Sequence, residues 1–151
     1  MEFEFLDQLN KIKGDEIDLI VEKRLQGDPK RSWVPTYFYH IVESGSDIPI
    51  GKIDLRIGFN ENTYYGGNIG YSVKEAHWGH HYAGKACLLI RQAAIAHGLD
   101  KVIITCNPDN IPSRKTCEYI GARLIEIVPL PPYNEQYLRG EKEKCIFEWS
   151  F

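Results

Sequence analysis

The sequence lacks any run approaching the roughly eighteen consecutive apolar residues that a membrane-spanning helix requires. It also lacks an excess of positive charge, because 18 Lys and Arg against 21 Asp and Glu give a net charge of -3. A chain without a broad basic surface is a poor partner for nucleic acid. The acidic start, Met-Glu-Phe-Glu-Phe, does not have the pattern of a signal peptide. We therefore expect a cytoplasmic protein that binds neither membranes nor nucleic acid.

The spacing of cysteine and histidine does not favour a metal site. No C-x-x-C pair occurs among the four cysteines, which lie in apolar or helical stretches and read as reduced, buried thiols; they are Cys87, Cys106, Cys117 and Cys145. His77, His80 and His81 crowd one loop, but no Cys, Asp or Glu lies nearby at ligand spacing. The chain also has no G-x-G-x-x-G after a strand, so a Rossmann dinucleotide site is not expected.

The 151 residues, of which 43% are hydrophobic, suit one α/β domain spanning 1–151. Period-2 alternation and β-branched runs predict strands at 16–24, 36–43, 48–57, 68–73, 102–106, 123–128 and 144–151. Helical spacing predicts helices at 83–97 and 111–120, and a short helix or arm within 1–14. We expect loops at 25–35 and 59–67, and an insertion at 129–140.

One stretch suggests a binding site for phosphate. Residues 68–73 read as a strand, a loop with Gly79 and Gly84 follows, and small and apolar residues recur at helical spacing from Ala83 onward. A strand that enters a helix through such a loop leaves unpaired N–H groups pointing at one spot, at the positive end of the helix dipole. This arrangement binds phosphate groups.

The same stretch resembles the pyrophosphate loop, Q/R-x-x-G-x-G/A, of the GNAT acyltransferase family. In Trp78-Gly79-His80-His81-Tyr82-Ala83, Trp78 replaces the Gln or Arg and His81 replaces the central Gly. A second segment, 107–122, is similar to the family's N-x-x-S/A helix, with Asn110 and Ser113 in the motif and Gly121 closing the helix. The resemblance covers roughly residues 16–128.

The resemblance implies a fold and a donor. The fold would be α/β, with a mixed, mostly antiparallel twisted sheet of six to seven strands, splayed at its centre and flanked by helices. The donor would be acetyl-CoA, with no metal, its pyrophosphate on the loop, its thioester near Val73 and its pantetheine arm on Asn110. The cofactor-binding residues so implied are Val73, Gly79, His80, His81, Tyr82, Ala83, Gly84, Lys85, Asn110 and Ser113.

The chemistry needs a base for the incoming amine and help for the departing thiolate. Asp54 lies on a strand, where Lys52 and Arg56 share its face and are expected to lower its pKa; Glu61 lies in the following loop. Both are candidate catalytic residues. Cys117 occupies the position where the family usually has a Tyr that protonates the thiolate. The simpler interpretation of Cys117 is a small apolar residue on a packed helix.

Two functions follow from the resemblance. The first is an N-acetyltransferase that transfers the acetyl group directly to an amine of a small molecule or protein. The second is a non-catalytic sensor or structural module that binds CoA or acetyl-CoA with the same fold. The helices that frame the acceptor site in the family look shortened or absent in 25–35. A homodimer is possible in either case.

Overall fold

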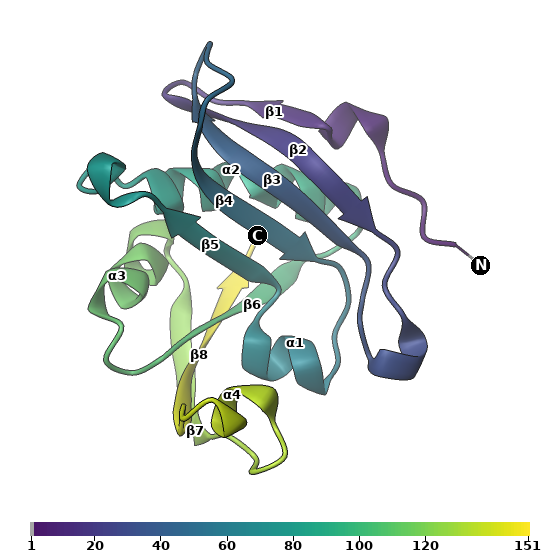
Figure 1. Ribbon diagram of the computed structural model, residues 1–151, viewed down its shortest axis with the longest axis vertical. Helices are drawn as coiled ribbons and strands as arrows, with labels where there is room; N and C mark the ends of the chain where they lie inside the picture. Colours follow the sequence, from purple (N-terminus) through teal and green to yellow (C-terminus); the bar gives the residue numbers. More distant parts are fainter. Residues whose placement is uncertain (1) are drawn as a thin grey trace.

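The computed structural model describes residues 2–151, and these residues form eight strands in two antiparallel sheets (Figure 1). The five-stranded sheet has the order β1-β2-β3-β4-β5, with β1 (Lys11–Lys13), β2 (Ile17–Leu25), β3 (Thr36–Glu43), β4 (Pro49–Arg56) and β5 (Ile69–Val73). The three-stranded sheet has the order β6-β8-β7, with β6 (Lys101–Cys106), β7 (Arg123–Pro129) and β8 (Glu143–Ser150). The predicted fold class is confirmed, with one strand more than expected.

Helices cover the sheets unevenly. The α-helices are α1 (Glu61–Gly66), α2 (Tyr82–Ala96), α3 (Ile111–Ile120) and α4 (Glu135–Leu138), and short 3-10 turns occur at Asp7–Leu9, Pro29–Arg31 and Glu75–His77. The long helix α2 packs across one face of the five-stranded sheet, and α3 packs beside α2 and β6. The opposite face of that sheet carries no helix in Figure 1. In the part of the chain that the structure describes, no helix is long and apolar enough to cross a membrane.

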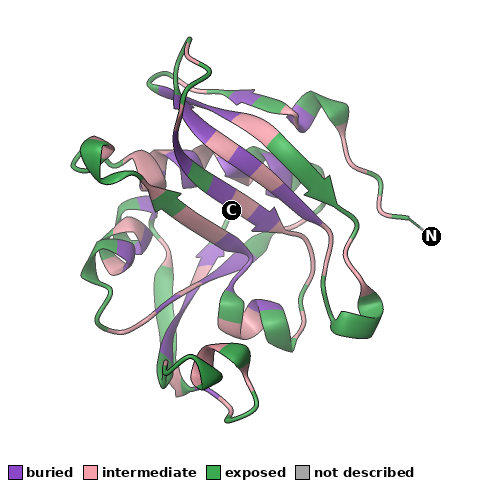
Figure 2. Ribbon diagram, viewed as in Figure 1, coloured by how far each residue is buried: buried purple, intermediate pink, exposed green. Residues whose placement is uncertain are grey.

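The core lies between α2 and the five-stranded sheet. Tyr37 and Tyr39 of β3 and Leu55 of β4 have no exposed surface, as their alternation in sequence predicts. They belong to the same cluster as the small residues of α2, such as Ala86 and Ala94. Figure 2 shows this buried band along the middle of the sheet, with exposed residues at the strand ends and loops.

Three segments differ from the sequence-based prediction. Within 1–14 only a 3-10 turn forms, followed by the short strand β1, which pairs with β2. The 59–67 segment was predicted as a loop, but it contains α1, because the Asn60 side chain accepts from the Thr63 N–H and the Thr63 hydroxyl accepts from the Asn60 N–H. The 129–140 insertion carries α4.

Asn68 joins the two sheets at one point. Its N–H donates to the Ile103 carbonyl at 2.6 Å, and its Oδ1 accepts from the Ile103 N–H at 2.8 Å. Its Nδ2 donates to the carbonyls of Arg56, at 3.0 Å, and Gly58, at 2.8 Å. One fully buried amide thus connects β6 to β5 and to the end of β4. Beyond it, β5 and β6 diverge (Figure 1).

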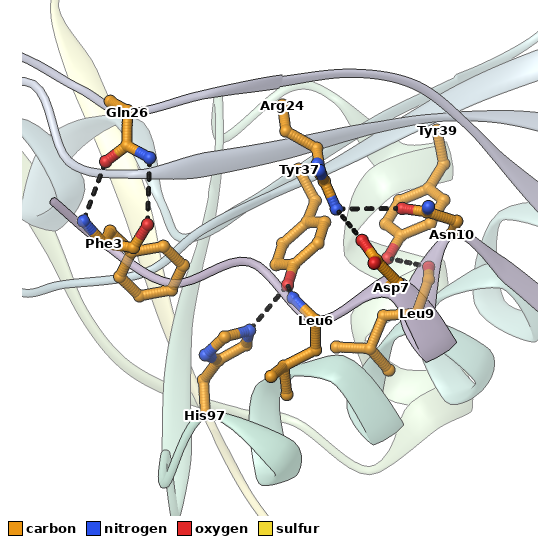
Figure 3. A network of polar contacts seen from close by, with 10 residues as sticks. All are labelled: Phe3, Leu6, Asp7, Leu9, Asn10, Arg24, Gln26, Tyr37, Tyr39 and His97. Atoms are coloured by element: carbon orange, nitrogen blue, oxygen red, sulfur yellow. Dashed lines mark hydrogen bonds and ion pairs between the residues drawn. The ribbon is translucent and has the colours of Figure 1, made fainter.

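The N-terminal arm is fastened to the far end of α2. The Leu6 N–H donates to the Tyr37 hydroxyl at 2.8 Å, and that hydroxyl lies 2.7 Å from Nε2 of His97, the C-cap of α2 (Figure 3). Phe3 exchanges two hydrogen bonds with the Gln26 side chain. These contacts explain His97 as a packed, hydrogen-bonded residue.

Candidate active site

β5 and β6 belong to different sheets and are not paired beyond Asn68, so the β6-facing edge of β5 carries backbone groups that bond to neither sheet. We call the region between the two diverging strands the wedge. The Lys74 N–H donates to the Ile50 carbonyl, and the Asn68 carbonyl accepts from the Arg56 N–H, so the even-numbered residues of β5 bond to β4. Because consecutive residues of a strand face opposite neighbours, the backbone groups of Tyr71 and Val73 point into the wedge.

The N-terminus of α2 lies at the open end of the wedge. Lys85 N–H makes the first intrahelical bond, to the His81 carbonyl, and no side chain caps the helix. Among residues 2–151, nothing accepts from the N–H groups of residues 82–84. His81 has φ 58 and ψ 28, and Gly79 has φ 90, so two residues of the loop are left-handed. His81 thus adopts the conformation that the family's central Gly supplies without strain.

Two side chains of the loop are engaged elsewhere. The indole N–H of Trp78 donates to the Val73 carbonyl at 2.7 Å, although the residue is 64% exposed. Trp78 therefore ties the loop back to the end of β5. Lys85 makes an ion pair with Glu16, whose hydrogen bond raises the pKa of that lysine. The backbone N–H groups of α2, rather than the Lys85 ammonium, are the free donors.

Gly84 has a packing role that sequence reasoning did not identify. A Cβ at this position would lie 2.3 Å from a ring carbon of Tyr119, which reaches across from α3. The same ring stacks on His81, with centroids 4.6 Å apart and an interplanar angle of 5°. Absence of a side chain at Gly84 therefore lets α3 approach the first turn of α2. A charged residue placed at Gly84 would disturb this packing as well as any ligand.

The start of α3 forms the other side of the wedge. Asn110 caps the helix, because its Oδ1 accepts from the Ser113 N–H at 3.2 Å. The hydroxyls of Ser113 and Tyr71 lie 2.7 Å apart, so they bridge α3 and β5. One turn further on, Cys117 is fully buried, and burial raises the pKa of its thiol to about 12. The thiol of Cys117 is therefore not ionised near neutral pH.

Asp54 lies on the uncovered face of the sheet, directly opposite Gly70 of β5. Its side chain is 20% exposed, and its Oδ1 is buried with no hydrogen-bond partner in the described part of the chain. Burial raises the pKa of Asp54, against the attraction of Arg56 at 3.5 Å. The expected lowering of this pKa was wrong, because burial outweighs Arg56 and because Lys52 pairs with Glu22 instead, at 3.9 Å.

Glu61 lies in a separate cleft of about 820 Å³, which Arg56 also lines. The walls come from residues 25–36, from α1 and from the 133–136 part of the insertion. The side chains of Asn60 and Asn62 donate to the Ser32 carbonyl, at 2.9 and 3.1 Å, and hold the first wall. Glu61 holds the second wall by accepting from the Tyr133 hydroxyl. No helix longer than the turn at Pro29–Arg31 frames the first wall, as expected.

The structure brings most of the predicted donor residues together. The 79–85 loop, Val73 and the start of α3 surround the wedge, while Asp54 and Glu61 lie on the other face of the sheet and in the cleft. Sequence reasoning missed Tyr71 and Tyr133; Tyr71 gave a signal only as an aromatic residue of a predicted strand. Among residues 2–151, no group of three or more His, Cys, Asp or Glu side chains could hold a metal ion.

This wedge, open beside an uncapped helix N-terminus, is accompanied by a family match over most of the chain. The family described as "Acetyltransferase (GNAT) domain" matches residues 12–123. The chain therefore belongs to the GNAT acetyltransferase family. No curated protein sequence matches it.

Solved structures share the fold at low sequence identity. A GNAT-family acetyltransferase from Bacillus anthracis is 23% identical, with a TM-score of 0.60, over 75% of this chain and 65% of that protein. A probable GNAT-family acetyltransferase from Chromobacterium violaceum ATCC 12472 is 13% identical, with a TM-score of 0.69, over 99% of this chain and 89% of that protein. The microcin C7 self immunity acetyltransferase MccE, solved with acetyl-CoA and AMP, is 19% identical, with a TM-score of 0.60, over 77% of this chain and 61% of that protein. This chain thus spans less than two thirds of the first and third of these proteins.

Proposed function

We propose that this protein is an N-acetyltransferase that takes its acetyl group from acetyl-CoA and passes it directly to an amine. The observation that carries the proposal is the wedge, where free backbone groups of β5 lead to the uncapped N-terminus of α2. A diphosphate binds the N–H groups of residues 82–84, aided by the helix dipole. An extended pantetheine arm then follows β5 as an additional strand would, past Val73.

The acceptor amine approaches from the face of the sheet that α2 leaves uncovered. The cleft carries Glu61 and Glu135, which make no ion pair with a described residue, and its two arginines are engaged with Asp28 and Asp54. This balance favours a positively charged acceptor, as an amine is in water. Asp54 is the base in the proposal, because its Oδ1, which accepts no hydrogen bond from a described residue, sits on a rigid strand and because its raised pKa suits proton transfer.

The transfer itself is one displacement. The ammonium first gives one proton to Asp54, directly or through one water, which frees the nitrogen lone pair. The nitrogen then forms a bond to the acetyl carbon, the carbon–sulfur bond breaks with its electron pair going to sulfur, and the second N–H proton passes to solvent. In this proposal the Val73 N–H, which faces the wedge, donates to the carbonyl oxygen as negative charge develops there. A donor of this kind contributes on the order of 3 kcal/mol.

A charge placed on the loop tests donor binding. His80→Glu adds a negative charge at an exposed position beside the free N–H groups, so the Kd for acetyl-CoA should rise about tenfold or more, as calorimetry would measure. The matched control, Gln92→Glu, adds the same charge to the exposed side of α2 ten residues after its start, roughly 15 Å away. Equal affinity for acetyl-CoA in wild type and both variants would show that the diphosphate does not bind at this loop.

Turnover separates the enzyme from a binding module. Release of CoA should be followed with a panel of small amines and peptide N-termini, using wild type and Asp54→Asn. The enzyme is supported by amine-dependent release that falls at least about tenfold in Asp54→Asn. Tight binding of acetyl-CoA with no release for any amine would support the alternative, a non-catalytic CoA-binding module. The Trp78 tether on Val73 favours that alternative, since it occupies a carbonyl of β5.

A further inference from the structure

Two hydroxyl groups form the only hydrogen-bonded side-chain bridge between β5 and α3 in the part of the chain that the structure describes. Tyr71 extends from β5, and its hydroxyl lies 2.7 Å from Ser113 Oγ. The Cys117 thiol lies near the same phenol. Ser113 is 9% exposed and Tyr71 is half-buried. A hydrogen-bonded pair of hydroxyls between a strand and a helix calls for a chemical explanation, since apolar residues would join the two elements at lower cost.

Tyr71 lies on the path of the donor. The backbone of Val73 and then of Tyr71 faces the wedge, so an arm that starts at the N-terminus of α2 and runs back along β5 passes Val73 first. The thioester, at the end of that arm, comes next to the segment between Val73 and Tyr71. This step rests on the proposed function, because it uses the proposed direction of acetyl-CoA.

We infer that the Tyr71 hydroxyl donates a hydrogen bond to the sulfur of CoA as the carbon–sulfur bond breaks. The electron pair of that bond stays on sulfur, and the phenolic hydrogen stabilises the negative charge. Ser113 supports the geometry, because its own hydroxyl can donate to the phenolic oxygen. The phenolic hydrogen, which otherwise makes a long hydrogen bond of 3.4 Å to the Ser113 carbonyl, can then turn to the sulfur. Tyr71 is thus a catalytic residue supplied by β5, and Ser113 is its positioning residue.

The phenol donates a hydrogen bond and does not surrender its proton. Burial raises the pKa of Tyr71 above the ordinary value of a phenol. The thiol of CoA has a pKa of about 8.5, like that of a free cysteine, so the thiolate is too weak a base to remove the proton. CoA leaves as the thiolate and takes a proton from water after release. Cys117 is a poor substitute donor, because a thiol donates weakly and this one is fully buried.

The test compares binding, turnover and the ionisation of bound CoA. Tyr71→Phe keeps the ring and removes the hydroxyl, so kcat should fall about a hundredfold while KM and the Kd for acetyl-CoA stay within about twofold. The pKa of the bound CoA thiol, followed by the ultraviolet absorbance of the thiolate, should rise in Tyr71→Phe, since the charge loses its donor. A purely structural role would leave that pKa unchanged.

Tyr39→Phe is the matched control. Tyr39 is another buried tyrosine of the same sheet, and its hydroxyl donates to the Leu9 carbonyl at 2.7 Å, away from the wedge. This variant should lose stability and keep kcat. If Tyr71→Phe does not fold, as circular dichroism would show, Ser113→Ala carries the test, with an expected fall in kcat of about tenfold and a smaller rise in the thiol pKa.

The outcomes separate this inference from the proposed function. If wild type turns over and both Tyr71→Phe and Ser113→Ala keep kcat within about threefold with the thiol pKa unchanged, this inference fails and the proposed function stands. If wild type binds neither CoA nor acetyl-CoA, both fail. If wild type binds CoA without turnover, a raised thiol pKa in Tyr71→Phe still supports the hydrogen bond to sulfur, and an unchanged one overturns it.

Discussion

Replacement of Asn68 should show how much of the fold depends on one buried amide. The side chain makes three hydrogen bonds, at 2.8, 3.0 and 2.8 Å, to the Ile103 N–H and to the carbonyls of Arg56 and Gly58. Asn68→Ala deletes all three, and at a net value of about 1 kcal/mol each the free energy of unfolding should fall by about 3 kcal/mol. For a chain of this size, that loss lowers Tm by roughly 6–12 °C.

The charged isostere adds a pH dependence to the same test. Asn68→Asp keeps the acceptor for Ile103 but loses both donors, and it buries a carboxylate at neutral pH, so it should be less stable than Asn68→Ala at about pH 7. Near pH 4 the difference in the free energy of unfolding between the two variants should be smaller, because protonation of the introduced carboxylate removes its charge and restores one donor. Urea unfolding followed by tryptophan fluorescence measures both variants at both pH values.

A matched control and a refuting result complete the test. Asn62→Ala removes an exposed amide that donates to the Ser32 carbonyl at 3.1 Å, so it should cost no more than about 0.5 kcal/mol. The reasoning is refuted if Asn68→Ala stays within about 1 kcal/mol of wild type with an unchanged m value. In that case apolar packing and the backbone hydrogen bond from Asn68 to Ile103 hold the two sheets together without the side chain.

Four further variants test the site and its surroundings. Burial raises the pKa of Asp54, so its negative charge lowers stability above that pKa. Asp54→Asn should therefore raise the free energy of unfolding by about 1 kcal/mol at neutral pH. Urea titrations should show this difference between variant and wild type shrinking toward pH 4. Burial lowers the pKa of His97, so stability is complete above the unfolded pKa of about 6.5 and declines as the pH falls; His97→Gln should flatten this decline between about pH 5 and pH 7.5. Gly84→Ala should cost about 1–3 kcal/mol, because its Cβ meets Tyr119, and Tyr119→Leu in the same chain should recover part of the loss, as paired Tm measurements would show. Cys117→Ala should lower Tm modestly and keep kcat within a few-fold, whereas a loss of about a hundredfold in a folded protein, about 2.7 kcal/mol, would give the thiol a role in turnover.

The elements around the wedge could be predicted from sequence because each has a local cause. Asn110 caps α3 and Gly121 ends it in a left-handed conformation, as the residue types indicate. The loop before α2 could be placed from small residues between a strand and a helical pattern. His81, which replaces the central Gly of the loop motif, has the positive φ that a glycine adopts most easily.

The cleft and the Asp54 environment could not be predicted, because they depend on contacts between distant segments. Asp54 shares a face with two cations in sequence, yet its pKa is set by burial against β3 and β5. The contact of Tyr133 with Glu61 joins residues 72 positions apart, so no local pattern reveals it. Helix α1 left a readable signal, the capping box of Asn60 and Thr63, which the neighbouring Asn and Gly residues obscured.

In the proposed acetyltransferase, the short helix α1 allows the acceptor cleft to change while the donor site stays the same. Both walls of the cleft are hydrogen-bonded to α1. The 25–36 wall is held by the Asn60 and Asn62 side chains, and the 133–136 wall by Glu61 and by the Tyr65 carbonyl, which accepts from Gln136. Neither wall contributes a residue to the wedge. The two wall segments can therefore change in length or sequence as the gene diverges. The distance between the walls, which α1 sets, and the site proposed for acetyl-CoA can stay the same.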